Sequence, residues 1–168
     1  MTLVELNALD DEAFVATLGG VAENAPWVAA LAATARPYES VEQVVAAFRA
    51  AILGAPEADR RALVAGHPDL AGRAALAGDL TADSAREQAS AGLDRLSPDE
   101  LAELTALNAA YRTRFGLPFV ICAREHSKES ILARLRERLG NDPAAEFEES
   151  VNEVVAIVRL RLESLLQG

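Results

Sequence analysis

Helix-start signals recur along this chain, and they limit the possible folds more than any other feature of the sequence. The clearest is Ser97-Pro98-Asp99-Glu100, which joins an N-cap serine to a proline at the first helical position and a glutamate at the third. Ser40-Val41-Glu42-Gln43 has the form of a capping box, and Asp142-Pro143 pairs an N-cap acid with a first-turn proline. Gly116 can take the left-handed conformation that ends a helix, so the segment from Ser97 is expected to be helical as far as Phe115.

The composition agrees with a helical protein. Hydrophobic residues make up 51% of the 168 residues, whereas aromatic residues make up only 5%. Alanine and leucine, which dominate the hydrophobic fraction, favour helices, while sheets are enriched in aromatic and β-branched residues. A chain of this length holds one well-buried core. We therefore predict an all-α, single-domain helical bundle over residues 1–168.

One segment does not fit a helical pattern. Leu117-Pro118-Phe119-Val120-Ile121-Cys122 is short, apolar and partly β-branched, which predicts a short extended and buried segment near 118–123. The amide and carbonyl groups of a lone extended segment need hydrogen-bond partners, and no second strand is evident in the sequence. A bound polar ligand is one candidate for such a partner.

The charge balance bears on the partners of the protein. Sixteen Lys and Arg residues against twenty-six Asp and Glu residues give a formal net charge of −10. Because binding to nucleic acid or to an anionic membrane is driven by basic surface, we expect neither as a partner. Arg134, Arg136 and Arg138 form a local basic cluster, although Glu137 interrupts it.

The cysteine content and the absence of known ligand motifs narrow the function further. Cys122 is the only cysteine, so it cannot form an internal disulfide, and no Cys/His spacing of a zinc site occurs. The sequence also lacks a phosphate-binding glycine loop and a nucleophile elbow. It has no secretion-signal pattern, and no apolar stretch approaches the roughly 18 residues that span a bilayer. We therefore expect a cytoplasmic protein, and an enzymatic function, if the chain has one, has to work without metal or organic cofactor.

The stretch from Gly66 to Gln88 holds the strongest candidate for a reactive site. His67 precedes a proline, which biases it toward an extended or turn conformation, and a histidine can change charge near neutral pH. Ser84, Glu87 and Gln88 are spaced i, i+3 and i+4, so on a helix they share one face. An imidazole facing a carboxylate and two neutral hydrogen-bonding groups can act as an acid and base.

A structural interpretation of the same residues is also open. Ser84-x-x-Glu87 fits a capping box, in which the two side chains satisfy free amides at a helix start. His67 can equally be a loop histidine bonded to backbone. Taken alone, the residues favour this structural interpretation. The predicted loop from His67 to Leu80 is long for a helix connection, which gives weak support to a functional site.

Arg161 interrupts the apolar stripe of the last predicted helix, which starts at Asp142-Pro143. The stripe consists of Phe147, Val151, Val154, Val158 and Leu165. A guanidinium on an inward-facing stripe is costly unless it is paired or hydrogen-bonded. Two interpretations are equally supported: a salt bridge to a neighbouring helix, or an anchor for an anionic or carbonyl group in a pocket.

Blocks spread over nearly the whole chain carry a family resemblance. They are Phe14 to Gly20, Glu23 to Trp27, Arg36-Pro37-Tyr38, His67-Pro68-Asp69-Leu70, Ser84-x-x-Glu87-Gln88, Gly92-Leu93, Leu107-Asn108-x-x-Tyr111, Arg114-Phe115-Gly116, Pro118 to Ala123 and Arg161-Leu162. In this order they resemble the OHCU decarboxylase family, which converts 2-oxo-4-hydroxy-4-carboxy-5-ureidoimidazoline to (S)-allantoin at the end of the route from urate. Several blocks in the right order are far more specific than any one alone.

The resemblance implies a fold, a reaction and a set of site residues. The family is all-helical, usually homodimeric, and uses neither metal nor organic cofactor. By motif, His67 is the catalytic histidine and general acid/base, with Glu87 and Arg161 as the other catalytic residues. The residues implied to bind the substrate are Pro68, Ser84, Ala85, Arg86, Gln88, Phe119, Val120, Ile121, Cys122 and Ala123. The implied partner is the small ureidoimidazoline, and Cys122 departs from the small residues that many relatives carry there.

Two other functions fit parts of the sequence. A non-enzymatic, all-helical interaction module would explain the alanine-rich composition and the acidity equally well. The second is a relative that keeps the fold and acts on a different ureide. His126, in the polar run Arg124 to Lys128, is expected to be a solvated loop residue.

Overall fold

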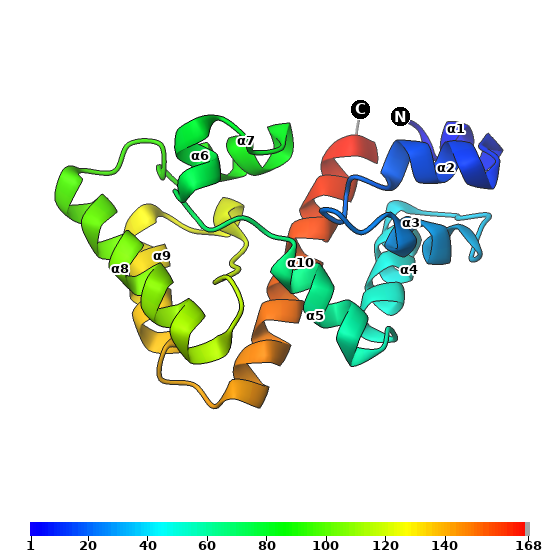
Figure 1. The fold of residues 1–168 in the computed structure, drawn as a ribbon. Helices are drawn as coiled ribbons and strands as arrows, with labels where there is room; N and C mark the ends of the chain where they lie inside the picture. Colours follow the sequence, from blue (N-terminus) through cyan, green and yellow to red (C-terminus); the bar gives the residue numbers. More distant parts are fainter. Residues whose placement is uncertain (167–168) are drawn as a thin grey trace. The chain divides into compact units, whose positions relative to one another are not determined.

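The structure is a computed structural model that describes residues 1–166, with the side chain of Ala74 left out (Figure 1). Over this range it contains helices and connecting segments and no β-strand, so the all-α prediction is confirmed. The chain forms two compact units. The first consists of Met1–Gly66 with the chain after Glu153, and the second is His67–Glu153.

The first unit begins with five helices. They are α1 (Leu3–Ala8), α2 (Asp11–Leu18), α3 (Pro26–Ala33), α4 (Val41–Leu53) and α5 (Glu57–Ala65). Ser40 caps α4 as the sequence predicts, and Asp10 caps α2. Helix α1 was not predicted from the sequence, although Thr2 and Glu5 form its capping box. Helix α3 packs against both α2 and α4, and apolar side chains of all three helices are buried.

The second unit is built around helices α8 and α9, which lie beside each other in Figure 1. Its elements are α6 (Arg73–Ala77), α7 (Ala82–Ser90), α8 (Pro98–Phe115), the short 3-10 helix η1 (Ala123–Glu125) and α9 (Lys128–Arg138). Ser97 and Glu100 form the predicted capping box of α8, and Gly116 ends it with φ 70°. Helix α6 was predicted as loop, because five residues give too little periodicity to detect.

The last helix, α10 (Pro143–Leu166), begins in the second unit and ends in the first. Asp142 Oδ2 accepts hydrogen bonds from the backbone N–H groups of Ala144 and Ala145, as expected for an N-cap. Four of the five predicted stripe residues are buried, and Leu165 is half-buried. Of the helices described over residues 1–166, none is both long and apolar enough to cross a membrane.

Candidate active site

The loop that carries His67 follows α5 directly. His67 is 7% exposed, and Pro68 is half-buried. Ala71, in the same loop, has a left-handed backbone with φ 47°. The backbone N–H of Ala71 donates a hydrogen bond of 2.9 Å to Oε1 of Gln88 on α7. This bond ties the His67 loop to the helix that carries Ser84, Glu87 and Gln88.

The structure shows whether Ser84 and Glu87 cap α7 or lie within it. The N-cap of this helix is Thr81, whose hydroxyl accepts from the backbone N–H of Ser84, so both residues lie inside the helix. The capping-box interpretation of Ser84 and Glu87 is therefore wrong. Ser84 and Gln88 are 5% and 6% exposed, and Glu87 between them is half-buried. The three residues share one helix face, as their spacing predicts.

Two other predicted substrate residues of α7 have exposed side chains. Ala85 and Arg86 both lie on the outer side of the helix, and Arg86 forms an ion pair with Asp83. Their side chains are therefore not part of the buried face. Their assignment to the substrate site stays a prediction.

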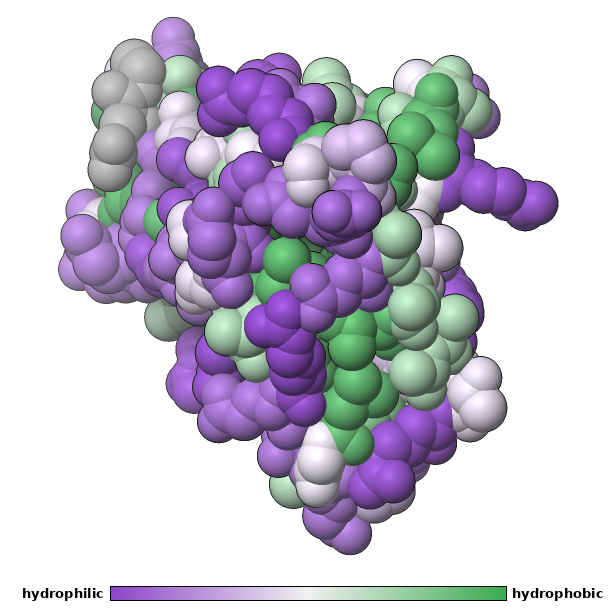
Figure 2. Space-filling view, turned by 90° about the vertical axis from the view of Figure 1, so that its left-hand side faces the viewer, coloured by the Kyte–Doolittle hydropathy of each residue, from purple (hydrophilic) through white to green (hydrophobic). Residues whose placement is uncertain are grey.

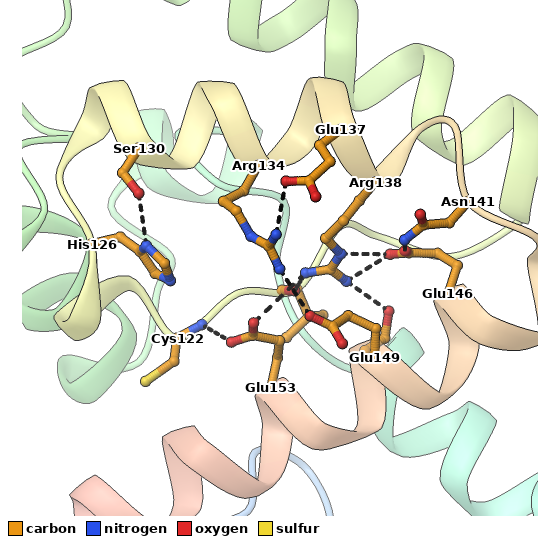
Figure 3. A network of polar contacts seen from close by, with 12 residues as sticks. Cys122, His126, Ser130, Arg134, Glu137, Arg138, Asn141, Glu146, Glu149 and Glu153 are labelled. Carbon is orange, nitrogen blue, oxygen red and sulfur yellow. Dashed lines mark hydrogen bonds and ion pairs between the residues drawn. The ribbon is translucent and has the colours of Figure 1, made fainter.

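Residues 118–122 lie outside any helix, as predicted, while Ala123 begins η1. All five residues from Phe119 to Ala123 are buried, with exposures of 1% to 5%. Arg138 Nη1 donates to the carbonyl of Val120 at 2.8 Å, and the N–H of Cys122 donates to Glu153 Oε2 at 2.8 Å (Figure 3). At these two positions the hydrogen-bond partner is therefore a protein side chain, and the expected polar ligand is not needed.

Arg138 belongs to a buried polar network. Its guanidinium is 1% exposed, pairs with the equally buried Glu146 and also donates to Ser150 Oγ at 3.1 Å (Figure 3). The carboxylate of Glu146 accepts from the hydroxyl of Tyr111 on α8. Burial raises the pKa of Tyr111 to about 12, and the bond to Glu146 acts in the same direction.

The assignment of Arg138 to a surface basic cluster was therefore wrong. The sequence held a signal for its burial, because Arg138 lies three and seven residues after Leu135 and Ile131, on the buried stripe of α9. By contrast, Arg134 and Arg136 lie at the surface and pair with glutamates.

The core of the second unit brings three predicted site segments together. Leu70 and Ala71 of the His67 loop pack in one hydrophobic cluster with Ala91, Phe119 and Ile121. Helix α7 also packs against η1, where the extended segment ends. The His67 loop, the helix with Ser84 and Gln88, and the segment from Phe119 to Ala123 thus share one core, although up to about fifty residues separate them in the sequence.

Arg161 lies in the first unit. Its side chain is 5% exposed, pairs with Glu23 Oε2 at 3.1 Å and donates to the carbonyl of Val21 at 3.2 Å. An ion pair was one of the two interpretations of this arginine, but the partner lies in the turn between α2 and α3 and not on a helix. Its role as an anchor for the substrate stays a prediction.

A cavity of about 420 Å³ lies beside α6 and α7. Ala85 and Gln88 border it, but the rest of its wall is mostly apolar, with residues such as Leu76, Leu80 and Leu93. Leu76 is 74% exposed. On the face shown in Figure 2, hydrophobic residues reach the surface between hydrophilic ones. Among the described residues that border this cavity none is Lys, Arg or His, so it offers no cation to the carboxylate of a ureidoimidazoline and is a poor candidate for the whole substrate site.

Two further observations concern metals and the second histidine. Within residues 1–166, no three or more His, Cys, Asp or Glu side chains are grouped so that they could hold a metal ion. His126 is half-buried, and its Nδ1 is hydrogen-bonded to Ser130 Oγ at 2.8 Å (Figure 3). It is therefore less solvated than expected.

Comparisons with known proteins agree with the family resemblance. A model of the family described as OHCU decarboxylase matches residues 7–163. The chain is 45% identical to 2-oxo-4-hydroxy-4-carboxy-5-ureidoimidazoline decarboxylase of Amia calva, covering 99% of this chain and 95% of that protein. It is 39% identical to the protein of the same name from Mus musculus, covering 99% and 93%. The crystal structure of an (S)-allantoin synthase superposes with a TM-score of 0.78 at 27% identity, over 99% of this chain and 54% of that one.

Proposed function

The chain belongs to the OHCU decarboxylase family, and we propose that it converts 2-oxo-4-hydroxy-4-carboxy-5-ureidoimidazoline to (S)-allantoin and CO2 in urate degradation. The observation that carries the proposal is the shared core of the three segments on which the family motifs fall. The buried imidazole of His67, 7% exposed, lies in one of these segments.

The chemistry can proceed without a metal or an organic cofactor. When the bond to the carboxylate breaks, its electron pair moves into the adjacent imine of the ring, and CO2 leaves. His67 takes the proton of the substrate hydroxyl, which becomes the carbonyl of the product. The imidazolium then gives that proton to the carbon that bears the ureido group, and the former imine nitrogen, which received the electron pair, takes a proton from water. Delivery of the proton to one face sets the S configuration.

The remaining site residues are assigned by the hydrogen-bonding groups they can offer. Glu87 would orient the imidazole of His67, and Arg161 would hold a carboxylate or carbonyl oxygen. In Gln88 the Oε1 atom accepts from Ala71, so the Nε2 group is the donor that this side chain can present to a ligand carbonyl. Within Phe119 to Ala123, backbone groups other than the carbonyl of Val120 and the N–H of Cys122 would contact the amide edges of the ring.

The proposal extends to organisation and location. The family match from residue 7 to residue 163 spans both compact units, which supports treating residues 1–168 as one OHCU decarboxylase-like domain. We propose a homodimer that binds neither nucleic acid nor membrane, on the basis of the family resemblance and the net charge of −10. A cytoplasmic location is supported by a single, buried cysteine.

A coupled assay tests the proposed reaction. The substrate is generated from urate enzymatically and immediately mixed with the protein, and optically active allantoin is followed by circular dichroism. The protein should accelerate formation of the (S) enantiomer, and racemic allantoin at the rate of the protein-free control would contradict the proposal. In a thermal-shift experiment, (S)-allantoin should raise the melting temperature, because it binds the folded state. An interaction module would show neither effect, and a relative specific for another ureide would respond to that ureide instead.

A further inference from the structure

The loop that carries His67 is held in place by side chains of α8. Arg112 donates from Nε and Nη2 to the two carboxylate oxygens of Asp69, at 3.2 and 3.0 Å. Asn108 donates from Nδ2 to the carbonyl of Leu70 at 3.1 Å. Neither contact is part of regular secondary structure, so these two side chains, together with Gln88 of α7, help to fix the path of this loop.

Helix α8 is itself anchored in the second unit, so its side chains can hold the loop in place. Asn108 and Arg112 are four residues apart and therefore lie on the same face of the helix. Between them, Tyr111 is 1% exposed and its hydroxyl donates to the carboxylate of Glu146 in the buried network. One face of α8 is thus fixed to the core of the second unit, while the neighbouring face holds the His67 loop.

One polar atom of Asn108 is buried in a way that destabilises the folded protein, so stability alone does not explain this residue. Its side chain is 9% exposed, and its Oδ1 atom is buried without a hydrogen-bond partner among the described residues. A buried polar atom without a partner lowers the stability of the folded state. The compensating gain at this position is the bond from Nδ2 to the carbonyl of Leu70, which fixes the backbone of the loop.

We propose that Asn108 and Arg112 are positioning residues for His67, an inference that rests on the proposed role of His67 as acid and base. Asp69 follows His67 by two residues, and the proline between them has a φ fixed near −65°. Holding Asp69 and Leu70 against α8 therefore limits the positions that the imidazole can reach. A misplacement of about 1 Å at a catalytic group can cost on the order of 100-fold in rate.

Arg112→Ala is the main test, because the Arg112–Asp69 pair is partly exposed and its loss opens no buried void. Arg114→Ala is the matched control: Arg114 is also exposed in the last turn of α8, but it donates to the carbonyl of Asn141 at 3.0 Å. Arg112→Ala should lower kcat by about 10- to 100-fold with a smaller change in KM. Arg112→Lys, which keeps the charge but loses the two-point contact, should recover part of kcat, and Arg114→Ala should keep the wild-type value.

A second measurement separates positioning from a merely structural role. His67 and His126 are the two histidines of the chain, so their ring signals can be followed by NMR in the protein without substrate. Arg112→Ala and Asn108→Leu should shift or broaden the ring signals of His67 and leave those of His126 unchanged. If Asn108→Leu does not fold, Arg112→Ala alone decides the question.

The possible outcomes distinguish this inference from the proposed function. Wild-type kcat in Arg112→Ala, or a fall in kcat with unchanged ring signals of His67, would overturn the positioning role. If the wild-type protein forms no (S)-allantoin, the proposed function fails, and the ring signals of His67 still report whether Arg112 and Asn108 fix the loop.

Discussion

Arg138→Met is expected to destabilise the protein far more than an ordinary arginine substitution. The side chains of Arg138 and Glu146 are each 1% exposed, so methionine leaves a buried carboxylate without its cation. Breaking one side of a buried ion pair costs about 3 to 5 kcal/mol. The guanidinium also lies 4.5 Å from the ring centre of Phe119 and bonds to the carbonyl of Val120, so the segment 118–122 should loosen as well.

The loss can be measured by thermal unfolding followed by far-UV circular dichroism. For a chain of this length each kcal/mol lowers the melting temperature by about 2 to 4 °C, so the expected decrease is about 6 to 20 °C. Glu146→Gln should also be strongly destabilising, because it leaves the buried guanidinium without its counterion. The double variant should cost less than the sum of the two single variants by about 1 to 3 kcal/mol, since the two groups stabilise each other.

Arg136→Met is the matched control for this experiment. Arg136 lies on the same helix, α9, with a side chain that is 53% exposed and paired with Glu103 at the surface. Its removal should cost no more than about 1 kcal/mol. Equal melting temperatures for Arg138→Met and Arg136→Met would refute the view that the buried network supports the core of the second unit.

Two further predictions concern pH and the His67 loop. Because the pKa of Tyr111 is about 12 in the folded protein and about 10 in an unfolded chain, the protonated tyrosine contributes its full stabilisation below about pH 10, and this is lost as the pH rises through 12. Urea midpoints should therefore fall over this range in the wild type and less so in Tyr111→Phe, and parallel pH profiles would contradict the assignment. In Gly72→Ala the added Cβ would lie 2.8 Å from Asp69 Cβ and 3.1 Å from its carbonyl oxygen, so we expect a loss of about 1 to 3 kcal/mol and slower turnover. Gly20→Ala, whose Cβ would meet nothing within 4 Å, should unfold like the wild type and serves as the control, and equal behaviour of the two variants would show that the loop tolerates the change.

The sequence predicts the helices well where the signal is local. Ser97 and Glu100 cap α8 through side chains three residues apart, and Gly116 ends the helix through its own backbone freedom. Such signals need no knowledge of the rest of the fold. Helices α1 and α6 were missed because they have six and five residues, too few for an apolar period to emerge.

The partners of polar groups were harder to predict, because they come from distant parts of the chain. Thr81 caps α7, so Ser84 does not have the capping role that its spacing to Glu87 suggests. The carbonyl of Val120 is bonded to an arginine that is 18 residues away, a pairing that no local pattern contains. The family motifs identified the segments that meet in the second unit, but the side chains of α8 and α9 that hold those segments required the structure.

The most direct test of the account compares His67→Ala with His126→Ala in the coupled allantoin assay. Both variants remove one of the two histidines of the chain, and both should keep the far-UV circular dichroism of the wild type. We expect His126→Ala to form (S)-allantoin at the wild-type rate, and His67→Ala to give only the racemic product at the uncatalysed rate. Formation of (S)-allantoin by His67→Ala at the wild-type rate would contradict the assignment of His67 as the acid and base.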